Sequence, residues 1–270
     1  MLNRLEQYLQ NLAPQGIALA YSGGVDSTLL LAVLSRVVQK LKFPVVALTM
    51  QTVLQNENEI AEAEDLARHY GIEQKIFHFN PFSLKEVRHN REDRCYHCKK
   101  AIFMQFADYA KAHGFAYIID GTNADDLQVY RPGRRALREL GVISPLAELG
   151  ISKTQIRQMS AELGLPTASK PAAPCMATRF AYNTLLDDKL VAQAAAGEKA
   201  VRQMFPDIRD IRLRVHGNLA RLEVSENSMP LVLPKAKELA AVLKQLGYEF
   251  VTLDLEGFRS GCFDTRLKGI

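Results

Sequence analysis

A glycine-containing loop rich in hydroxyl side chains lies near the N-terminus of the sequence. It reads Ser-Gly-Gly-Val-Asp-Ser from Ser22 to Ser27 and follows the apolar run 16–21. Paired glycines let backbone N–H groups approach phosphate oxygens, and a helix N-terminus adds partial positive charge. The loop lacks the Gly-Lys-Ser/Thr ending of a kinase P-loop and the GxGxxG spacing of a dinucleotide site. It predicts a phosphate site of another class, although two glycines could also form an ordinary strand-to-helix turn.

A second polar segment, Asp-Gly-Thr-Asn-Ala-Asp-Asp, runs from Asp120 to Asp126 and follows the apolar run 115–120. Strand ends in a parallel sheet meet at one edge, so we expect this segment to lie beside the glycine loop. Asp125 and Asp126 carry carboxylate oxygens, which Mg²⁺ prefers as ligands. Each could equally belong to an Asx-type turn that caps a helix.

The cysteines are the other reactive residues. Cys95 and Cys98 lie three residues apart at the start of a predicted helix, beside basic residues that favour the thiolate. A lone CxxC is also compatible with a redox pair or with half of a zinc site. Cys175 stands in a proline-bounded loop that ends in Arg179, although an isolated cysteine is more often a small buried hydrophobe.

Apolar runs alternate with helical patterns along the first two thirds of the chain, which predicts an α/β fold with a parallel sheet covered by helices. A capping box at Ser152 and Gln155 predicts a helix that ends near Gly164. We expect a domain boundary near residue 180, giving domains 1–180 and 181–270, the smaller for substrate contact or oligomerisation. Predicted strands are 16–21, 44–50, 74–79, 115–120, 208–215, 219–224 and 249–255, and predicted helices include 26–40, 57–70, 95–113, 185–205 and 234–246.

Composition describes an ordinary globular protein rather than a fibre or a disordered chain. Of 270 residues, 47% are apolar and 24% are charged, and the net charge of +4 falls short of a nucleic-acid binder's excess. The longest apolar runs are far shorter than the roughly 20 residues that cross a bilayer, and the N-terminus lacks an export signal pattern. Four cysteines with one CxxC favour a reducing compartment. We therefore predict a cytoplasmic protein without nucleic-acid or membrane partners.

The loop from Ser22 to Ser27 resembles the PP-motif of the N-type ATP pyrophosphatases, which cleave ATP to AMP and pyrophosphate. Together with RCYHCK, GTNADD, SKPAAPCMATR and EFVTLDLEGFRSG, it resembles the LarE family over nearly the whole chain. The resemblance implies a sulfurtransferase that adenylates the carboxylates of pyridinium-3,5-biscarboxylic acid mononucleotide and converts them to thiocarboxylates. It also implies a homo-oligomer that hands its product to the nickel-inserting enzyme of nickel pincer nucleotide biosynthesis.

The resemblance also assigns roles to individual residues. Cys175 is the implied sulfur donor, either sacrificially, becoming dehydroalanine, or as a ligand of a 4Fe-4S cluster with Cys95 and Cys98. Because all these cysteines are present, we favour the cluster and interpret Cys262 as structural. Asp26 and Arg179 are implied catalytic residues, and magnesium is assigned to Asp26 and Asp126. The implied ATP site comprises Ala20, Ser22, Gly23, Gly24, Val25, Asp26, Ser27, Thr49, Met50, Gly121, Thr122, Asn123 and Asp125.

Two other functions remain open at this point. A tRNA thiolase also joins a PP-loop to cysteines but should carry a strongly basic surface or an RNA-binding module. A non-catalytic metal or nucleotide sensor would bind ATP without releasing pyrophosphate. Arg214, His216 and Arg221 could clamp a substrate phosphate or carboxylate, although their alternation with apolar residues favours a strand with one solvated face.

Overall fold

The computed structural model describes residues 1–55, 57–129, 131–171, 173–259 and 263, so Cys262 lies outside the described residues. The chain divides into two compact units. The first contains Met1–Asn80 and Asp93–Ala173, and the second contains Pro81–Glu92 together with the chain from Pro174. The last crossing between units lies close to the predicted boundary near residue 180, whereas no sequence signal separates the segment 81–92 from its neighbours.

The first unit is built on a parallel sheet with strand order β3-β2-β1-β4. Its strands are β1 (Ile17–Ala20), β2 (Val45–Gln51), β3 (Glu73–His78) and β4 (Tyr117–Ile119). Ile17 pairs with Val45 on one side and with Tyr117 on the other, so β1 is a central strand. The sheet confirms the predicted α/β class, and it brings the chain segments that follow β1 and β4 to the same edge.

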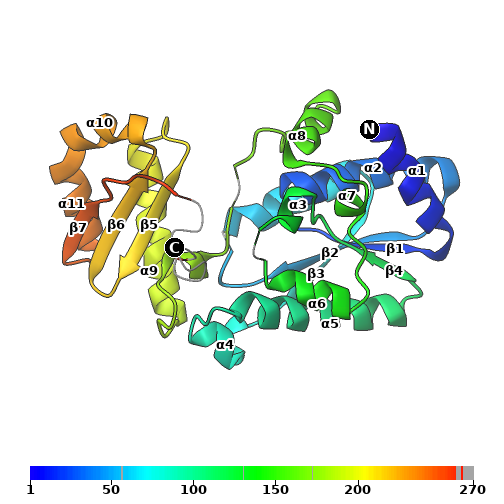
Figure 1. The fold of residues 1–270 in the computed structure, drawn as a ribbon, viewed down its shortest axis with the longest axis horizontal. Helices are drawn as coiled ribbons and strands as arrows, with labels where there is room; N and C mark the ends of the chain where they lie inside the picture. Colours follow the sequence, from blue (N-terminus) through cyan, green and yellow to red (C-terminus); the bar gives the residue numbers. More distant parts are fainter. Residues whose placement is uncertain (56, 130, 172, 260–262, 264–270) are drawn as a thin grey trace. The chain divides into compact units, whose positions relative to one another are not determined.

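Helices cover both faces of this sheet (Figure 1). Ile17 and Leu19 face one hydrophobic core with residues of α1, α2, α7 and α8, while Ala18 faces a second core with residues of α5 and α6. This alternation follows from the two-residue side-chain period of a strand that is buried on both faces. The helices of the first unit are α1 (Leu2–Leu12), α2 (Val25–Leu41), α3 (Glu57–His69), α5 (Arg94–Ala112), α6 (Gly133–Glu139), α7 (Pro145–Glu148) and α8 (Lys153–Glu162).

The predicted capping box at the start of α8 is present. The side chain of Ser152 accepts from the backbone N–H of Gln155, and the Ser152 backbone N–H donates to Gln155 Oε1 at 2.9 Å. Two otherwise unpaired backbone donors are thereby satisfied. The box fixes where α8 begins and so places Lys153, its first residue.

The second unit contains a sheet of order β5-β6-β7 packed with α9 and α11. β5 and β6 pair antiparallel, whereas β6 and β7 pair parallel. Gly197 of α9 packs so closely on the sheet that an added Cβ would lie 2.6 Å from Leu213 Cδ2. The bounds are α4 (Lys85–Arg88), α9 (Asp188–Met204), β5 (Ile211–His216), β6 (Leu219–Val224), α10 (Met229–Val232), α11 (Ala236–Gln245) and β7 (Phe250–Leu253).

Asn90 explains why the segment 81–92 folds with the second unit. This fully buried residue donates from Nδ2 to the carbonyl oxygens of Phe180 and Ala181, at 3.1 and 2.8 Å. Its own carbonyl accepts from the backbone N–H of Asn183. Such long-range bonds leave no local sequence pattern.

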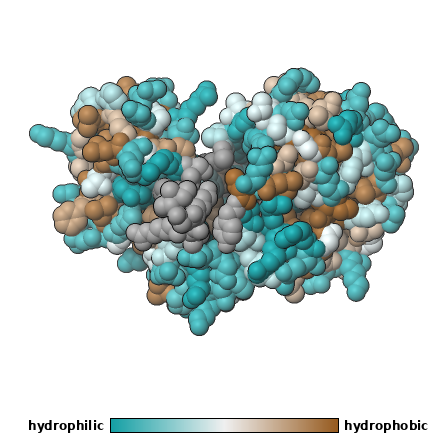
Figure 2. All heavy atoms as spheres, viewed as in Figure 1, coloured by the Kyte–Doolittle hydropathy of each residue, from teal (hydrophilic) through white to brown (hydrophobic). Residues whose placement is uncertain are grey.

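Hydrophilic residues cover much of the surface visible in Figure 2, with hydrophobic residues between them. None of the helices in the described ranges combines the length and apolar character needed to span a bilayer.

Candidate active site

The glycine loop connects the end of β1 to the start of α2. Gly23 has a φ of +69°, and an added Cβ would lie 2.9 Å from Ala63 Cβ on α3, so a larger residue would both strain the backbone and clash. Gly24 is the extended N-cap of α2 and has no side chain to accept from the first helical N–H groups. The backbone N–H groups of Val25 and the residues after it are therefore suited to bind an anion.

Two serines hold the loop in shape. Ser27 Oγ lies 3.1 Å from Ser22 Oγ and donates to the Gly24 carbonyl at 3.2 Å. Ser27 Oγ also accepts from the backbone N–H of Ser22 at 3.2 Å. These hydroxyl groups hold the loop in shape through bonds within the loop itself.

Asp26, in the first turn of α2, is the charged centre of the site. Its Oδ1 accepts from Asn123 Nδ2 at 3.2 Å, and its Oδ2 lies 2.5 Å from Lys153 Nζ. The Asp26 side chain is 21% exposed, so solvent or an ion can still reach the carboxylate. Gly121 permits this arrangement, because an added Cβ would lie 3.1 Å from both Asp26 Cβ and Ser27 N. The structure thus brings Asp26, Gly121 and Asn123 together, as predicted from the parallel sheet.

The neighbouring carboxylates make local bonds. Asn123 Oδ1 accepts from the backbone N–H groups of Asp125 and Asp126, which forms the Asx-type turn that was one of the interpretations of this segment. Asp125 Oδ2 accepts from the backbone N–H of Lys153 at 2.8 Å, and Asp126 Oδ1 pairs with Arg131 at 2.8 Å. Both carboxylates therefore organise the chain around Asp26, and their magnesium role stays a prediction.

Asp120, at the end of β4, links this edge to the cysteine helix α5. Its buried carboxylate accepts from Thr122 Oγ1 and Ser144 Oγ, both at 2.6 Å. Lys99 Nζ lies 3.4 Å from Asp120 Oδ2. Because Lys99 follows Cys98 directly, the start of α5 is anchored beside the segment that contacts Asp26.

Two lysines at the phosphate loop are among the site residues that the sequence did not reveal. Lys153 reaches Asp26, and Lys170 donates to the Gly23 carbonyl at 3.4 Å and pairs with Glu62 at 2.8 Å. They belong to a capping segment and to an irregular loop, where lysine is unremarkable. The sequence offered one signal for Lys153: it directly follows the capping residue Ser152 and so must lie at the start of a helix.

β2 extends beyond the end of β1, and this extension offers a place for a flat heterocycle. β1 ends with Ala20 opposite Leu48, and the Tyr21 N–H donates to the Leu48 carbonyl, whereas β2 continues to Gln51. Backbone groups of a strand alternate in direction, so those of Met50 point to the same side as those of Leu48, beyond the end of β1. Thr49 instead uses its hydroxyl within the fold, donating to the Tyr21 carbonyl at 2.7 Å.

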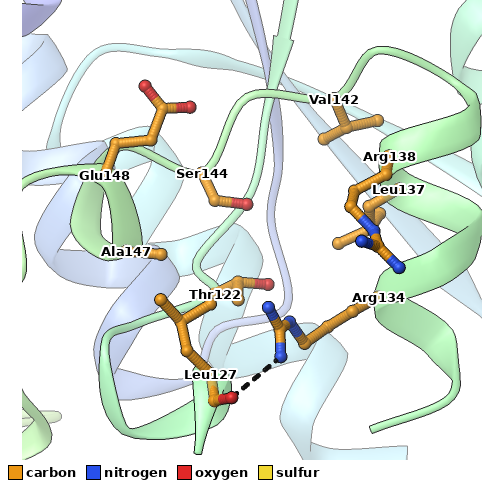
Figure 3. A pocket seen from close by; sticks show the side chains of 9 residues that line it. All are labelled: Thr122, Leu127, Arg134, Leu137, Arg138, Val142, Ser144, Ala147 and Glu148. Carbon is orange, nitrogen blue, oxygen red and sulfur yellow. Dashed lines mark hydrogen bonds between the residues drawn. The ribbon is translucent and has the colours of Figure 1, made fainter.

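A cavity of about 230 Å³ lies between α6 and α7, and Thr122 is one of the residues that line it (Figure 3). Arg134 and Arg138 reach into it from α6, while Thr122 and Ser144 line the opposite wall. Arg134 donates to the carbonyls of Asp126 and Leu127. Neither arginine pairs with a carboxylate within the described part of the chain. Glu148 also lines the cavity, but its carboxylate accepts from the Tyr8 hydroxyl, so the two guanidinium groups are suited to bind a small anion.

Cys95 and Cys98 lie in the first turn of α5, where Cys95 is exposed and Cys98 is partly buried. Tyr96 between them stacks under Arg135 of α6, with the guanidinium carbon 3.6 Å from the ring centre. The described residues contain no group of three or more His, Cys, Asp or Glu side chains placed for a metal ion. Cys175 belongs to the other unit, so the predicted three-cysteine cluster stays a prediction.

Cys175 is exposed and begins the one-turn 3-10 helix Met176–Arg179. Its carbonyl accepts from the Thr178 N–H at 3.0 Å and from Thr178 Oγ1 at 2.8 Å. Arg179, a predicted catalytic residue, is buried and donates to the Pro174 carbonyl at 3.0 Å. The backbone of this turn is thus held on both sides of the thiol.

Buried ion pairs contact the backbone of this turn. Arg179 binds Glu198 through Nε and Nη2, at 2.9 and 2.8 Å, and Arg214 binds Glu223 at 2.9 Å while donating to the Thr178 carbonyl at 2.6 Å. The interpretation of the β5 arginines as a solvated face is wrong for Arg212 and Arg214, which are buried.

Burial and charge together shift the pKa values of Glu198 and Arg212. Burial favours a higher pKa for Glu198, but hydrogen bonds and charge from Arg179, with Arg212 and Arg202, outweigh it and lower the pKa below its ordinary value. Burial, together with the charge of Arg179, lowers the pKa of Arg212 to about 10. Both groups are charged at neutral pH.

Sequence comparison finds relatives over most of the chain. A model of the NAD synthase family matches residues 1–177. An uncharacterized protein of Synechocystis sp. is 38% identical over 245 residues, which cover 90% of each chain. The pyridinium-3,5-bisthiocarboxylic acid mononucleotide synthase of Lactiplantibacillus plantarum is 34% identical over 248 residues, which cover 92% of this chain and 88% of that protein.

Structural comparison supports the fold. The U34-tRNA thiolase NcsA of Methanococcus maripaludis, solved with its 4Fe-4S cluster, superposes with a TM-score of 0.50 at 17% identity. The match covers 76% of this chain and 73% of that chain. At this identity the likeness shows a shared architecture and nothing about substrate or cluster.

Proposed function

Because this chain belongs to the LarE family of ATP-using sulfurtransferases, we propose that it converts the carboxylates of pyridinium-3,5-biscarboxylic acid mononucleotide to thiocarboxylates. The 34% identity to the synthase of Lactiplantibacillus plantarum over 92% of this chain is the observation that carries the proposal. Oligomerisation and transfer of the product to a nickel-inserting enzyme stay predictions.

Activation of the carboxylate is assigned to the first unit. The glycine loop and the N-terminus of α2 fit the pyrophosphate part of ATP, and the part of β2 at Met50 that extends beyond β1 fits adenine. Asp26, which contacts Asn123 and Lys153, would hold a magnesium ion, and the ion would supply positive charge to the phosphates. Lys153 and Lys170 would then neutralise charge on the leaving pyrophosphate. An acceptor carboxylate oxygen attacks the α-phosphorus, forming an acyl-adenylate and releasing pyrophosphate.

The cavity between α6 and α7 is our candidate for an anionic group of the acceptor. Its arginines carry positive charge without a carboxylate partner in the described ranges, and Thr122 on its wall adjoins Gly121, which contacts Asp26. A carboxylate or phosphate bound by Arg134 and Arg138 would hold the acceptor beside the nucleotide.

Sulfur transfer is assigned to Cys175. Its thiolate attacks the acyl carbon and displaces AMP, which is a good leaving group, to give a thioester. In the sacrificial form, loss of the Cys175 α-proton and cleavage of its Cβ–S bond release the thiocarboxylate and leave dehydroalanine. Exposure of Cys175 in a turn whose backbone is hydrogen-bonded supports a role as donor.

The alternative to sacrificial donation is sulfur transfer through a 4Fe-4S cluster, and this is the route that we favour for this chain. Cys95 and Cys98, one helical turn apart at the start of α5, fit two ligands of a 4Fe-4S cluster, with Cys175 as the proposed third. Such a cluster, when bound, would supply a sulfide on its open iron and permit repeated turnover. The Lys99–Asp120 pair would then hold this helix start beside the nucleotide segment.

The test incubates anaerobically purified protein with ATP, Mg²⁺ and the pyridinium dicarboxylate mononucleotide. We expect pyrophosphate release that depends on this acceptor, and a gain of about 16 mass units for each oxygen replaced by sulfur. A loss of about 34 mass units from the protein would identify sacrificial donation, whereas bound iron with sulfide-dependent turnover would identify the cluster route. Pyrophosphate release with tRNA but not with the mononucleotide would refute the proposal.

A further inference from the structure

The turn that carries Cys175 is held by a pair of buried Arg–Glu contacts. Arg179 joins Glu198 to the Pro174 carbonyl, and Arg214 joins Glu223 to the Thr178 carbonyl. Side chains of Arg179 and Glu198 are 3% and 8% exposed, and those of Arg214 and Glu223 are 5% and 1% exposed. The cation in each contact therefore binds a backbone oxygen of the turn on one side and a buried carboxylate on the other.

Thr178 completes the arrangement at the centre of the turn. Its hydroxyl donates to the Cys175 carbonyl at 2.8 Å and accepts from Arg179 Nη1 at 3.0 Å. The carbonyls of Pro174, Cys175 and Thr178 are thus all bonded, although the Cys175 side chain is exposed. A charged donor bonded to a buried carboxylate has a fixed direction, and a bidentate arginine contact adds geometric specificity.

We propose that Arg179 and Arg214, each fixed by its buried glutamate, are positioning residues that hold the Cys175 turn for sulfur transfer. Glu198 engages Arg179 with both oxygens and also accepts from the backbone N–H of Leu213. These contacts tie Glu198 both to Arg179 and to the backbone of β5. This inference rests on the proposed function only in its last step, since the order of the turn itself can be measured without substrate.

Lysine substitution tests the arginines. Lysine keeps the charge of Arg179 but cannot reach both Glu198 and the Pro174 carbonyl with a planar fork. We expect R179K and R214K to speed hydrogen exchange of the Thr178 and Phe180 amides, which bond to Cys175 and Ala177 within the turn. We also expect about tenfold less thiocarboxylate per pyrophosphate released, because adenylation belongs to the other unit.

Arg202 provides a matched control. It also pairs with Glu198, at 3.3 Å, but its carbonyl partners in the described structure are Arg209 and Ile211 rather than residues of the turn. R202K should leave both the exchange of the turn and the sulfur-to-pyrophosphate ratio within about twofold of the parent protein.

Thr178 gives a second test that leaves both arginines and both glutamates in the chain, although it removes one acceptor of Arg179. T178V removes the hydroxyl that bonds Cys175, whereas T178S keeps it, so we expect T178V to behave like R179K and T178S like the parent. Equal effects of R179K and R202K, or pyrophosphate release that falls together with sulfur transfer, would overturn the inference. If the parent protein transfers no sulfur, the proposed function fails, and the exchange measurements still decide whether these residues hold the turn.

Discussion

The phosphate loop and the Cys175 turn use polar groups in opposite ways. At the loop, Gly24 leaves the first N–H groups of α2 uncapped by a side chain, and Asp26 remains partly exposed between Asn123 and Lys153. At the turn, backbone carbonyls are bonded to buried arginines, and Cys175 is exposed. A site that binds an exchangeable nucleotide needs available donors, whereas a site that presents one reactive atom needs a fixed backbone.

The largest expected effect lies at Asp26. D26N keeps the size of the side chain but removes the charge that would hold magnesium and pair with Lys153. We expect pyrophosphate release to fall by about a hundredfold or more, as for loss of a principal electrostatic contact. Chelation of magnesium should have a similar effect on the parent protein. A quenched-flow pyrophosphate assay measures both, and D65N on α3, an exposed carboxylate paired with Arg68, is the control.

Glu198, which supports the Cys175 turn, provides the next test. E198Q leaves Arg179 without its buried counter-charge, so the free energy of unfolding should fall by about 3 kcal/mol at neutral pH. Because the folded pKa of Glu198 is lowered, its contribution is present above its ordinary pKa of 4.5 and is lost as pH falls through the folded value. The difference between E198Q and the parent protein should therefore shrink below about pH 4.5.

Circular dichroism suits this measurement, since the chain has no Trp for fluorescence. A difference that stays constant from pH 7 to pH 3.5 would contradict the assigned charge state of Glu198. R202K should show a much smaller loss of stability, because the Arg202 side chain is 39% exposed.

Substitution of a cavity arginine should have a smaller effect on activity. It tests whether the cavity of the first unit binds the acceptor. R138Q removes one positive charge from the cavity and should raise the KM for the acceptor by about tenfold, while the KM for ATP changes little. R135Q is the neighbouring control, since Arg135 pairs with Glu139 and stacks on Tyr96 outside the cavity. Equal changes in both KM values would remove the cavity from the acceptor site.

The sequence predicted some features of these two regions and not others. Apolar runs closed by glycine predicted the parallel sheet, and a parallel sheet necessarily brings Ser22–Ser27 and Asp120–Asp126 to one edge. The alternation of arginines in β5 was ambiguous, because a two-residue period does not say whether the polar face meets water or Glu223. The contacts of Lys153 and Lys170 with the loop, and of Asn90 with the second unit, depend on chain crossings that no local pattern encodes.

The capping box at α8 carries the smallest expected effect. S152A should lower the free energy of unfolding by about 1 kcal/mol, because the Gln155 N–H loses its side-chain acceptor. It should also shift Lys153 slightly and weaken ATP binding. The effect of S152A on pyrophosphate release should be smaller than the fall expected for D26N. T154A in the same first turn is a control, and thermal unfolding followed by circular dichroism reports the change.

The division of labour between the two regions is tested most directly by C175A in a single turnover with ATP, Mg²⁺ and the pyridinium dicarboxylate mononucleotide. Pyrophosphate and thiocarboxylate are quantified by mass spectrometry in the same samples. We predict that C175A releases pyrophosphate at close to the parent rate and forms no thiocarboxylate. Thiocarboxylate formed by C175A at the parent rate, or loss of pyrophosphate release in C175A, would contradict the account.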